Sequence, residues 1–282
     1  MRGDPSYLSE PMPTDKAPRT VPELIVAALQ GDQDDEQAWE AVHRLRARAD
    51  QETWDAAVAL IRSSRTRERG RGVDILAQFG ASTSTPRSPE LRARCADQLL
   101  ECLRTEQDAA VLNAIGVGLG HLDDPRAVQA LLPLRNHPDE GVRFGVVFGL
   151  GGHETPEAID ALIQLSADPD DDVRDWATFE LGTISELDTR PLREALVARL
   201  GDENAEIRGE ALAGLACRKD PRVVEPLRRE LAGGDVGVLA LEAAQKLGDV
   251  SLFPLLEKLR PSGDSFFDHV LEDVVRQLRG ER

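Results

Sequence analysis

Histidine beside glutamate is the first pattern that could do chemistry, because the two side chains can bind a metal ion or transfer a proton. His153-Glu154 is the one adjacent pair, and two glycines precede it, which is typical of a turn after a helix. His121, His137 and His153 recur every sixteen residues. Since His137 follows a different kind of turn from the other two, we do not expect convergence and predict no metal site.

Two further patterns resemble binding motifs but lack key residues. An acidic run at 168–172 would need Gly at 173 and Glu at 179 to form a calcium loop, and the chain has Val173 and Phe179 there. Alternating glycines at 116–120 have no preceding strand, as a dinucleotide site requires. We interpret the first as a helix-capping turn and the second as close helix packing, and we predict no catalytic residue and no cofactor.

Composition restricts the partner and the compartment. The 282 residues carry 51 acidic and 34 basic side chains, a net charge of −17, which opposes binding to a nucleic-acid backbone. Three scattered cysteines (Cys95, Cys102 and Cys217) favour a reducing cytoplasm. There is no signal-peptide pattern and no stretch that could span a membrane. Basic charge is mostly arginine, as in high-GC bacterial genomes, so we expect a bacterial, cytoplasmic, monomeric protein.

The elements that position these residues are predicted to be short helices. Residues 1–20 are rich in proline and poor in branched aliphatic residues, so we expect a flexible tail. From Val21 onward apolar residues recur at spacings of three and four, interrupted by Gly, Pro or Asp, and no convincing strand pattern appears. The chain is therefore predicted to be all-α.

A repeat of about 31 residues organises these helices. A helix-ending Leu-Gly or similar step recurs at Leu119-Gly120, Leu150-Gly151, Leu181-Gly182, Leu215-Ala216 and Leu247-Gly248. An aliphatic residue lies eight positions before each step and another apolar residue four positions before it, which marks one face of a helix. Asp-Pro and Thr-Pro pairs start the other helix of each unit. A fixed period of this length is typical of a solenoid of helical hairpins.

These patterns predict the division of the chain. After the tail we expect irregular helical repeats at 21–88, regular repeats at 89–248 and capping helices at 249–282, about eight hairpins in all. A Ser/Thr/Pro-rich loop at 81–89 could be a hinge.

Asp168-Pro169, Val173-Arg174, Ala177 and Leu181-Gly182 together resemble the HEAT repeat, and the period is similar to that of short bacterial HEAT-like repeats associated with phycobilisome lyases. The resemblance implies a right-handed α-solenoid. It also implies an Asp–Arg ladder between neighbouring repeats, with Asp168 and Arg174, and Asp202 and Arg208, as its members. Because His137 replaces the Asp before Arg143, the ladder should be incomplete.

Such repeats serve as binding scaffolds, as chromophore lyases and, in deoxyhypusine hydroxylases, as metal enzymes. The hydroxylases place His-Glu pairs directly after the Val-Arg of the second helix. The matching positions here are Phe144-Gly145, Asp175-Trp176 and Gly209-Glu210, so the metal site is not expected.

Aromatic residues concentrate in two consecutive second helices. Four of the chain's 11 aromatic residues are Phe144, Phe148, Trp176 and Phe179. Side chains two and six residues after the start of the apolar stripe point away from it, and Phe144, Phe148 and Phe179 hold such positions, with Trp176 adjacent. Because second helices of HEAT-type solenoids line the concave face, the resemblance implies that these rings lie there. Exposed aromatic groups there indicate a binding site, although packing between repeats could bury them.

Acidic charge concentrates in the same repeats. Residues 153–215 contain 16 acidic residues and five arginines, so −11 of the net −17 lies there. Asp175, Glu180 and Glu210 belong to the same second helices, and we expect them to rim the aromatic surface. The sequence thus predicts a non-catalytic scaffold that binds a basic protein, as an adaptor, inhibitor or immunity protein. The alternatives are a tetrapyrrole (bilin) lyase-like enzyme or chaperone and, less favoured, a nucleic-acid binder using arginines near 44–71.

Overall fold

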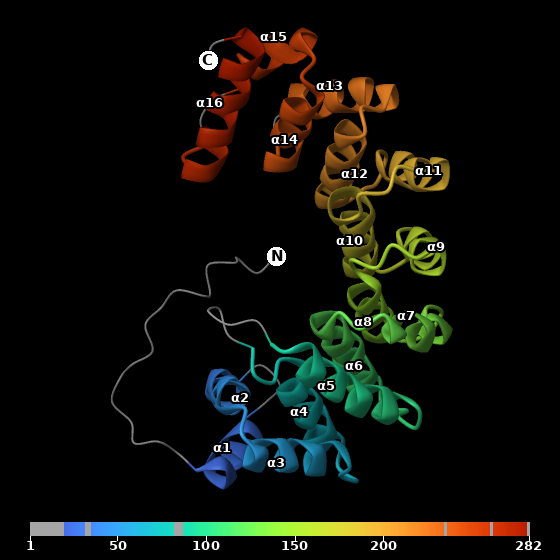
Figure 1. The fold of residues 1–282 in the computed structure, drawn as a ribbon. Coiled ribbons are helices and arrows are strands. Elements are labelled where there is room, and N and C mark those ends of the chain that lie inside the picture. Colours follow the sequence, from blue (N-terminus) through green and yellow to red (C-terminus); the bar gives the residue numbers. More distant parts are fainter. Residues whose placement is uncertain (1–19, 32–34, 82–86, 234–235, 260–261, 281–282) are drawn as a thin grey trace. The chain divides into compact units, whose positions relative to one another are not determined.

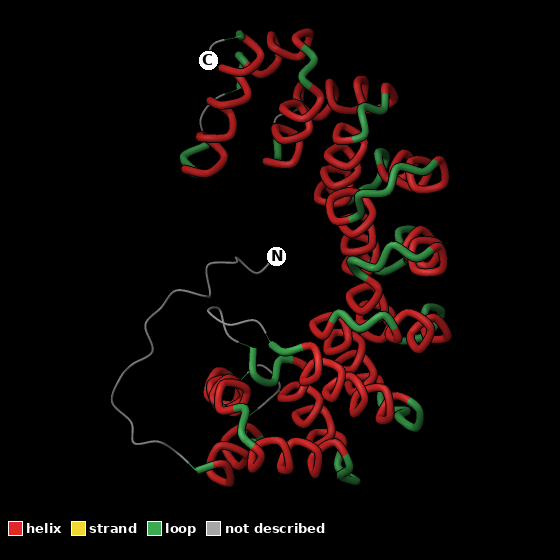
Figure 2. The backbone as a smooth tube through the Cα atoms, viewed as in Figure 1, coloured by secondary structure: helices red, strands yellow, loops and turns green. Residues whose placement is uncertain are grey.

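Short amphipathic segments with capping residues at both ends fold into helices along the whole described chain (Figures 1 and 2). The structure, a computed structural model, describes residues 20–31, 35–81, 87–233, 236–259 and 262–280. Within those residues every regular element is helical, so the predicted all-α solenoid is confirmed. The expected flexible tail and most of the 81–89 loop lie outside them.

Contacts divide the chain into two compact units, residues 1–87 and 88–282. The first unit contains two hairpins: α1 (Val21–Ala28), α2 (Glu36–Arg48), α3 (Gln51–Ile61) and α4 (Thr66–Ala77).

The second unit contains the remaining six hairpins, so the described residues hold the eight that the repeat predicts. Its helices are α5 (Pro89–Leu103), α6 (Ala109–Leu122), α7 (Arg126–Leu131), α8 (Glu140–Leu150), α9 (Pro156–Leu165), α10 (Asp171–Phe179), α11 (Arg190–Arg199), α12 (Ala205–Cys217), α13 (Val224–Ala232), α14 (Val238–Leu247), α15 (Phe253–Leu256) and α16 (Ser265–Arg279). Short 3₁₀ turns adjoin three of them: η2 (Leu132–Leu134), η4 (Pro221–Val223) and η5 (Val250–Leu252). A π-helical turn, η3 (Glu180–Ile184), continues α10.

The helix starts follow the expected capping chemistry. Thr155 accepts a hydrogen bond from the amide of Ala158 at the start of α9, and Thr189 does the same for α11. In the acidic turns, Asp139 and Asp170 cap α8 and α10. Each cap satisfies an amide that the helix itself leaves without a partner, so these turns fix where each helix begins.

Within the second unit, the second helices of successive hairpins pack on one another in a layer. Contacts run from α6 to α8, α10, α12 and α14 in turn, and Figure 1 shows these helices stacked beside the first helices α7, α9, α11 and α13. We call them the second-helix layer. The predicted apolar stripe is buried between the layers, as Val142, Val146 and Leu150 show in α8.

Glycines set the spacing within this layer at its beginning. A Cβ on Gly145 of α8 would lie 2.8 Å from the carbonyl oxygen of Asn113 of α6, and a Cβ on Gly116 would meet the Gly145 carbonyl. The backbones of α6 and α8 therefore touch directly, and the close packing predicted for the 116–120 glycines is realised at Gly116.

Candidate functional site

Four rings from two helices form one cluster in the second-helix layer. The ring centre of Trp176 lies 5.9 Å from that of Phe144, 5.8 Å from Phe148 and 5.7 Å from Phe179. Two of these contacts are edge-to-face, with interplanar angles of 84° and 82°, which suits the ring quadrupoles. All four side chains are half-buried. We call these residues the aromatic cluster.

The aromatic cluster extends onto a third helix. The exposed His121, at the end of α6, stacks edge-on against Phe148 with ring centres 5.1 Å apart. The sequence singled out His121 only as a metal-ligand candidate. Its contact with a ring 27 positions along the chain depends on how α6 and α8 cross, and no spacing in the sequence carries that information.

The three carboxylates predicted to rim the aromatic cluster are buried instead. Asp175 is 9% exposed, Glu180 is 8% exposed and Glu210 is fully buried. The expectation of a solvent-facing rim formed by these residues was wrong. A second helix contacts the hairpins on both sides, so residues that point away from its own hairpin can point into the next one.

Each of two buried carboxylates contacts a specific group on a neighbouring element. Oε2 of Glu180 accepts a hydrogen bond from the amide of Gly152 at 3.2 Å, and its Oε1 lies 2.5 Å from where a Cβ on Gly151 would be. Oε2 of Glu210 accepts a hydrogen bond from the hydroxyl of Thr183 at 3.1 Å. Burial raises the pKa of Glu180 to about 7.

One arginine satisfies the carbonyl groups around the π-helical turn. Arg218, which follows α12, donates hydrogen bonds to the carbonyl oxygens of Leu181, Gly182, Gly214, Ser185 and Leu187 at 2.7–3.0 Å. Four of these carbonyls belong to the irregular segment that follows α10, and the fifth, that of Gly214, belongs to α12. Arg218 therefore fixes the end of α10, directly after the aromatic cluster, against α12.

Other carboxylates of residues 153–215 are exposed, even though the three predicted to rim the aromatic cluster are buried. The acidic residues that are exposed between 153 and 215 are Glu154, Glu157, Asp160, Asp171, Asp172, Glu186, Asp188, Glu194, Glu203 and Glu206. Of the five arginines in this range, Arg190 is exposed and the other four are half-buried. The surface is therefore acidic, as the sequence predicts, through a different set of residues.

The Asp–Arg ladder exists with different pairs. Arg143 binds Asp168 through two hydrogen bonds of 2.7 Å, and Arg174 binds Asp202 at 2.9 and 3.1 Å. The pairing of Asp168 with Arg174 that the resemblance implied was wrong, since Arg174 binds only the backbone carbonyl of Asp168, at 2.8 Å. Each arginine binds the Asp of the next repeat along the chain. The pair therefore does not require an Asp in the turn of the arginine's own repeat.

The ladder continues beyond the positions that the sequence marks. Arg208 was expected to pair with Asp202, and instead it contacts Glu230 of α13 at 3.2 Å while bonding the Asp202 carbonyl at 2.9 Å. The hydrogen bonds that Arg143 donates to Asp168 raise the pKa of Arg143 above its ordinary value. The ion pairs of Arg143 with Asp168 and of Arg174 with Asp202 thus join consecutive repeats, and the two arginines lie on the helices that carry the aromatic cluster.

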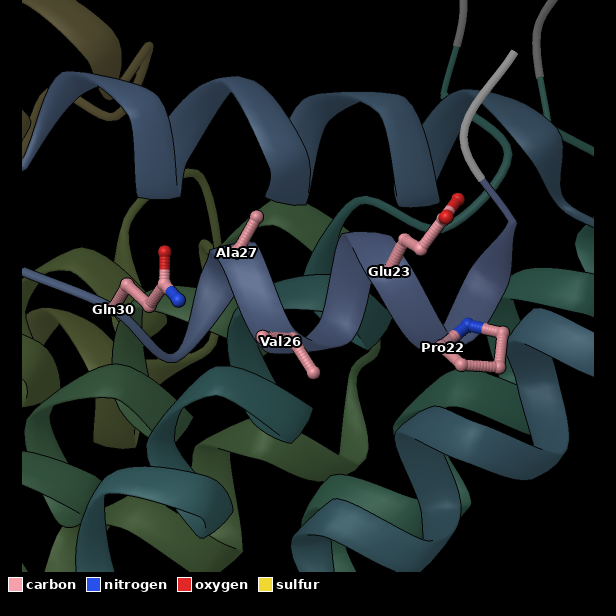
Figure 3. Close-up of a pocket in the computed structure, with 5 residues that line it drawn as sticks. All are labelled: Pro22, Glu23, Val26, Ala27 and Gln30. Atoms are coloured by element: carbon pink, nitrogen blue, oxygen red, sulfur yellow. The ribbon is translucent and has the colours of Figure 1, made fainter.

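A shallow hollow of about 460 Å³ lies along α1 in the first unit (Figure 3). Residues of α1 and of the turn after it line the hollow: Pro22, Glu23, Val26, Ala27 and Gln30. Val26 is 56% exposed there, and no group suited to acid–base or nucleophilic catalysis other than Glu23 is present. The sequence analysis did not identify this hollow.

The described residues can also be searched for metal-binding groups, reactive cysteines and membrane-spanning helices. Among the described residues, no three His, Cys, Asp or Glu side chains are arranged to hold a metal ion. Cys95 is buried, Cys102 half-buried and Cys217 exposed. No helix in the described part of the chain is long and apolar enough to cross a membrane.

Comparison with known families decides the classification. The family model for HEAT repeats matches residues 96–182 and 162–248, which together cover more than half of the chain. The chain belongs to the HEAT-repeat family. The HEAT repeats include every residue of the aromatic cluster and the ladder from Arg143 to Glu230.

Protein YibA of Escherichia coli strain K12 is a relative with 39% identity over 96 residues. That sequence match spans 34% of this chain and 34% of YibA, about a third of the relative's length. The X-ray structure of YibA matches with a TM-score of 0.70 and 23% identity, covering 94% of this chain and 98% of the other. Kap95, in its complex with Nup1, matches with a TM-score of 0.64 and 18% identity over 93% of this chain and 40% of Kap95. These structural likenesses show the HEAT solenoid fold.

Proposed function

We propose that this HEAT-repeat protein is a non-catalytic, monomeric cytoplasmic scaffold whose aromatic cluster binds a protein partner with a basic surface. Adaptor, inhibitor or immunity roles fit such a scaffold. The observation that carries the proposal is the aromatic cluster itself: Phe144, Phe148, Trp176 and Phe179 form a continuous, half-exposed group on neighbouring second helices. Clustered, partly exposed aromatic rings of this kind are typical of interface hot spots.

Charge supports the basic partner. Three of the ten exposed carboxylates between 153 and 215 form ion pairs with arginines (Asp171, Asp188 and Glu194), and the other seven leave the exposed surface of these repeats negatively charged. An acidic surface accelerates encounter with a cationic partner, while desolvated aromatic contacts slow dissociation. Kap95, which shares the fold, forms a complex with the protein Nup1, so the architecture supports protein binding of this kind.

Quantitative affinity capture from the native host tests the proposal. The bait is the full chain, compared with the double variant Phe148→Ala, Trp176→Ala and with the control Phe266→Ala, a ring on α16 that is 58% exposed. We expect a basic protein to be captured by the wild type and the control and lost, by at least tenfold, from the double variant. Capture of every partner by the double variant at wild-type levels would contradict the proposal.

A further inference from the structure

Glu180 occupies a position that glycine holds in other second helices. It lies seven residues after Val173, the first residue of the buried stripe in α10. The matching residues are Gly118 in α6, Gly149 in α8 and Gly214 in α12. In α8 and α12, a glycine at this position lets neighbouring helices approach closely, whereas α10 carries a carboxylate there. Close helix packing therefore does not account for the glutamate.

The Glu180 carboxylate is buried with little to stabilise its charge. It is 8% exposed and accepts one hydrogen bond, from the amide of Gly152. No lysine, arginine or histidine of the described residues forms an ion pair with it. The ladder arginines of α8 and α10, Arg143 and Arg174, are bound to Asp168 and Asp202. Burial raises the pKa of Glu180 to about 7.

Of the other charged groups around Glu180, Glu154, Glu210 and Arg218 are held by contacts of their own, whereas Nε2 of His153 is buried without a hydrogen-bond partner among the described residues. From the α8–α9 turn, Glu154 accepts hydrogen bonds from the hydroxyl of Ser185 and the amide of Glu186, and His153 lies next to Gly152. From α12, Glu210 accepts the hydroxyl hydrogen bond of Thr183, and Arg218 is bound to backbone carbonyls. Asp175 is the buried carboxylate of α10 itself.

Glu180 is coupled to the aromatic cluster through the backbone. It directly follows Phe179, whose ring lies 5.7 Å from that of Trp176, and it begins the π-helical turn. On the opposite side, Gly151 and Gly152 follow the helix that carries Phe144 and Phe148. The carboxyl group thus joins the two helices that form the aromatic cluster.

We propose that protonation of Glu180, whose buried carboxyl group lies between α8 and α10, controls the packing of the aromatic cluster and, resting on the proposed function, makes partner binding sensitive to pH. When protonated, the neutral carboxyl remains buried against Gly151 and Gly152 and holds α10 on α8. When ionised, the carboxylate draws water to itself, the turn moves away from these glycines, and Phe179 and Trp176 loosen. Partner binding is then stronger at pH 6 than at pH 8.

A pH titration of the free chain tests the switch. The variant Trp39→Phe, Trp54→Phe leaves Trp176 as the single tryptophan, which is excited selectively at about 295 nm. Between pH 5.5 and 8.5 we expect a sigmoidal change in its emission with a midpoint near 7, and a flat response when Glu180→Gln is added. Since Trp54 is buried, labelling the otherwise native chain with 5-fluorotryptophan and following the ¹⁹F signal of Trp176 gives the same reading if the double variant does not fold.

Histidines supply the matched controls, because an ordinary imidazole titrates in the same range. His121 contacts Phe148, and His153 follows Gly152. We expect the transition to persist in His121→Gln and in His153→Gln. A transition that survives Glu180→Gln, or disappears with either histidine change alone, would overturn the inference.

The free-chain titration involves no partner, so it separates the switch from the proposed function. If partner capture is insensitive to Trp176→Ala while the titration depends on Glu180, the proposed function fails and the proton-controlled packing stands. If both hold, affinity for the captured partner should fall about fivefold from pH 6 to pH 8 in the wild type and stay constant in Glu180→Gln. An unchanged affinity in the wild type would contradict the regulatory role.

Discussion

Arg174 joins three segments of the solenoid with one guanidinium group. It bonds the carboxylate of Asp202 in the next repeat, the carboxylate of Asp171 and the carbonyl of Asp168. The Arg174 and Asp202 side chains are 13% and 8% exposed, so this pair is largely removed from water. An exposed ion pair contributes little to stability, but loss of one partner from a buried pair leaves an unpaired charge.

Arg174→Ala should therefore lower the free energy of unfolding by about 3 kcal/mol. Arg190→Ala, at an exposed position of α11, should change it by less than about 0.5 kcal/mol. Urea unfolding followed by circular dichroism measures both. Equal effects of the two changes would mean that the ladder contributes nothing to stability.

Glu180 should give stability an unusual pH dependence. Its pKa is raised in the folded chain from 4.5 to about 7, so the folded state binds a proton that the unfolded state has released. Its contribution to stability is fully present below pH 4.5 and is lost as the pH rises to 7. The shift corresponds to about 3 kcal/mol.

Glu180→Gln should remove this loss. Relative to the wild type, the variant should be more stable at pH 8 than at pH 5 by up to about 3 kcal/mol, measured by urea unfolding at the two pH values. A stability difference between the two chains that is the same at both pH values would show that Glu180 does not titrate in this range.

At the residue scale, the sequence predicted the aromatic positions better than the acidic ones. The spacing within α8 and within α10 places Phe144 with Phe148 and Trp176 with Phe179 on one face of each helix. Whether Glu180 or Glu210 meets water depends on the neighbouring hairpin, which no spacing within a single helix describes. Ladder pairs failed for the same reason, because Arg174 reaches forward to a different repeat.

Glycine positions in the second-helix layer set the distance between its helices. A Cβ on Gly116 would meet the backbone carbonyl of Gly145, which cannot move without shifting α8. Gly70, in contrast, lies within α4 with nothing within 4 Å of an added Cβ. Substituting Gly116 therefore tests the effect of close packing on stability, and substituting Gly70 tests the effect of helix propensity.

Gly116→Ala should lower the free energy of unfolding by about 2 kcal/mol through overpacking. Gly70→Ala should raise it by about 0.5–1 kcal/mol, because alanine favours the helix more than glycine does. Chemical denaturation of the two variants in parallel provides the measurement. A stabilising Gly116→Ala would contradict the direct backbone contact between α6 and α8.

At the scale of elements, the sequence predicted the hairpins because their signals are local. Thr155, Thr189 and Asp170 cap helices where the capping pattern places them. It did not predict the π-helical turn at 180–184, in which the carbonyl groups of Leu181 and Gly182 accept hydrogen bonds from Arg218, 37 and 36 positions along the chain. That contact exists only once two hairpins have packed.

At the scale of the whole molecule, the net charge of −17 should influence how fast a partner arrives more than how long it stays. Raising NaCl from about 0.05 to about 0.5 M should slow association with the captured partner by about tenfold and change the dissociation rate by less than threefold. Surface plasmon resonance resolves both rates. An association rate independent of salt would contradict a basic partner.

The family and the repeat architecture could be predicted from sequence because each unit of about 31 residues carries its own signals. The partner could not, because the fold of HEAT repeats serves many functions and only surface residues distinguish them. Under the proposed function the distinguishing surface is the aromatic cluster, and a partner covers it.

Acrylamide quenching of Trp176 tests that claim most directly, in the Trp39→Phe, Trp54→Phe chain with and without the captured partner. Trp176 is half-buried in the free chain, so acrylamide should quench it measurably. Any tryptophan of the partner is replaced by phenylalanine, so that only Trp176 is observed. We predict that saturating partner lowers the quenching constant at least threefold, because contact at a hot spot excludes water and solutes. An unchanged quenching constant with the partner fully bound would contradict binding at the aromatic cluster.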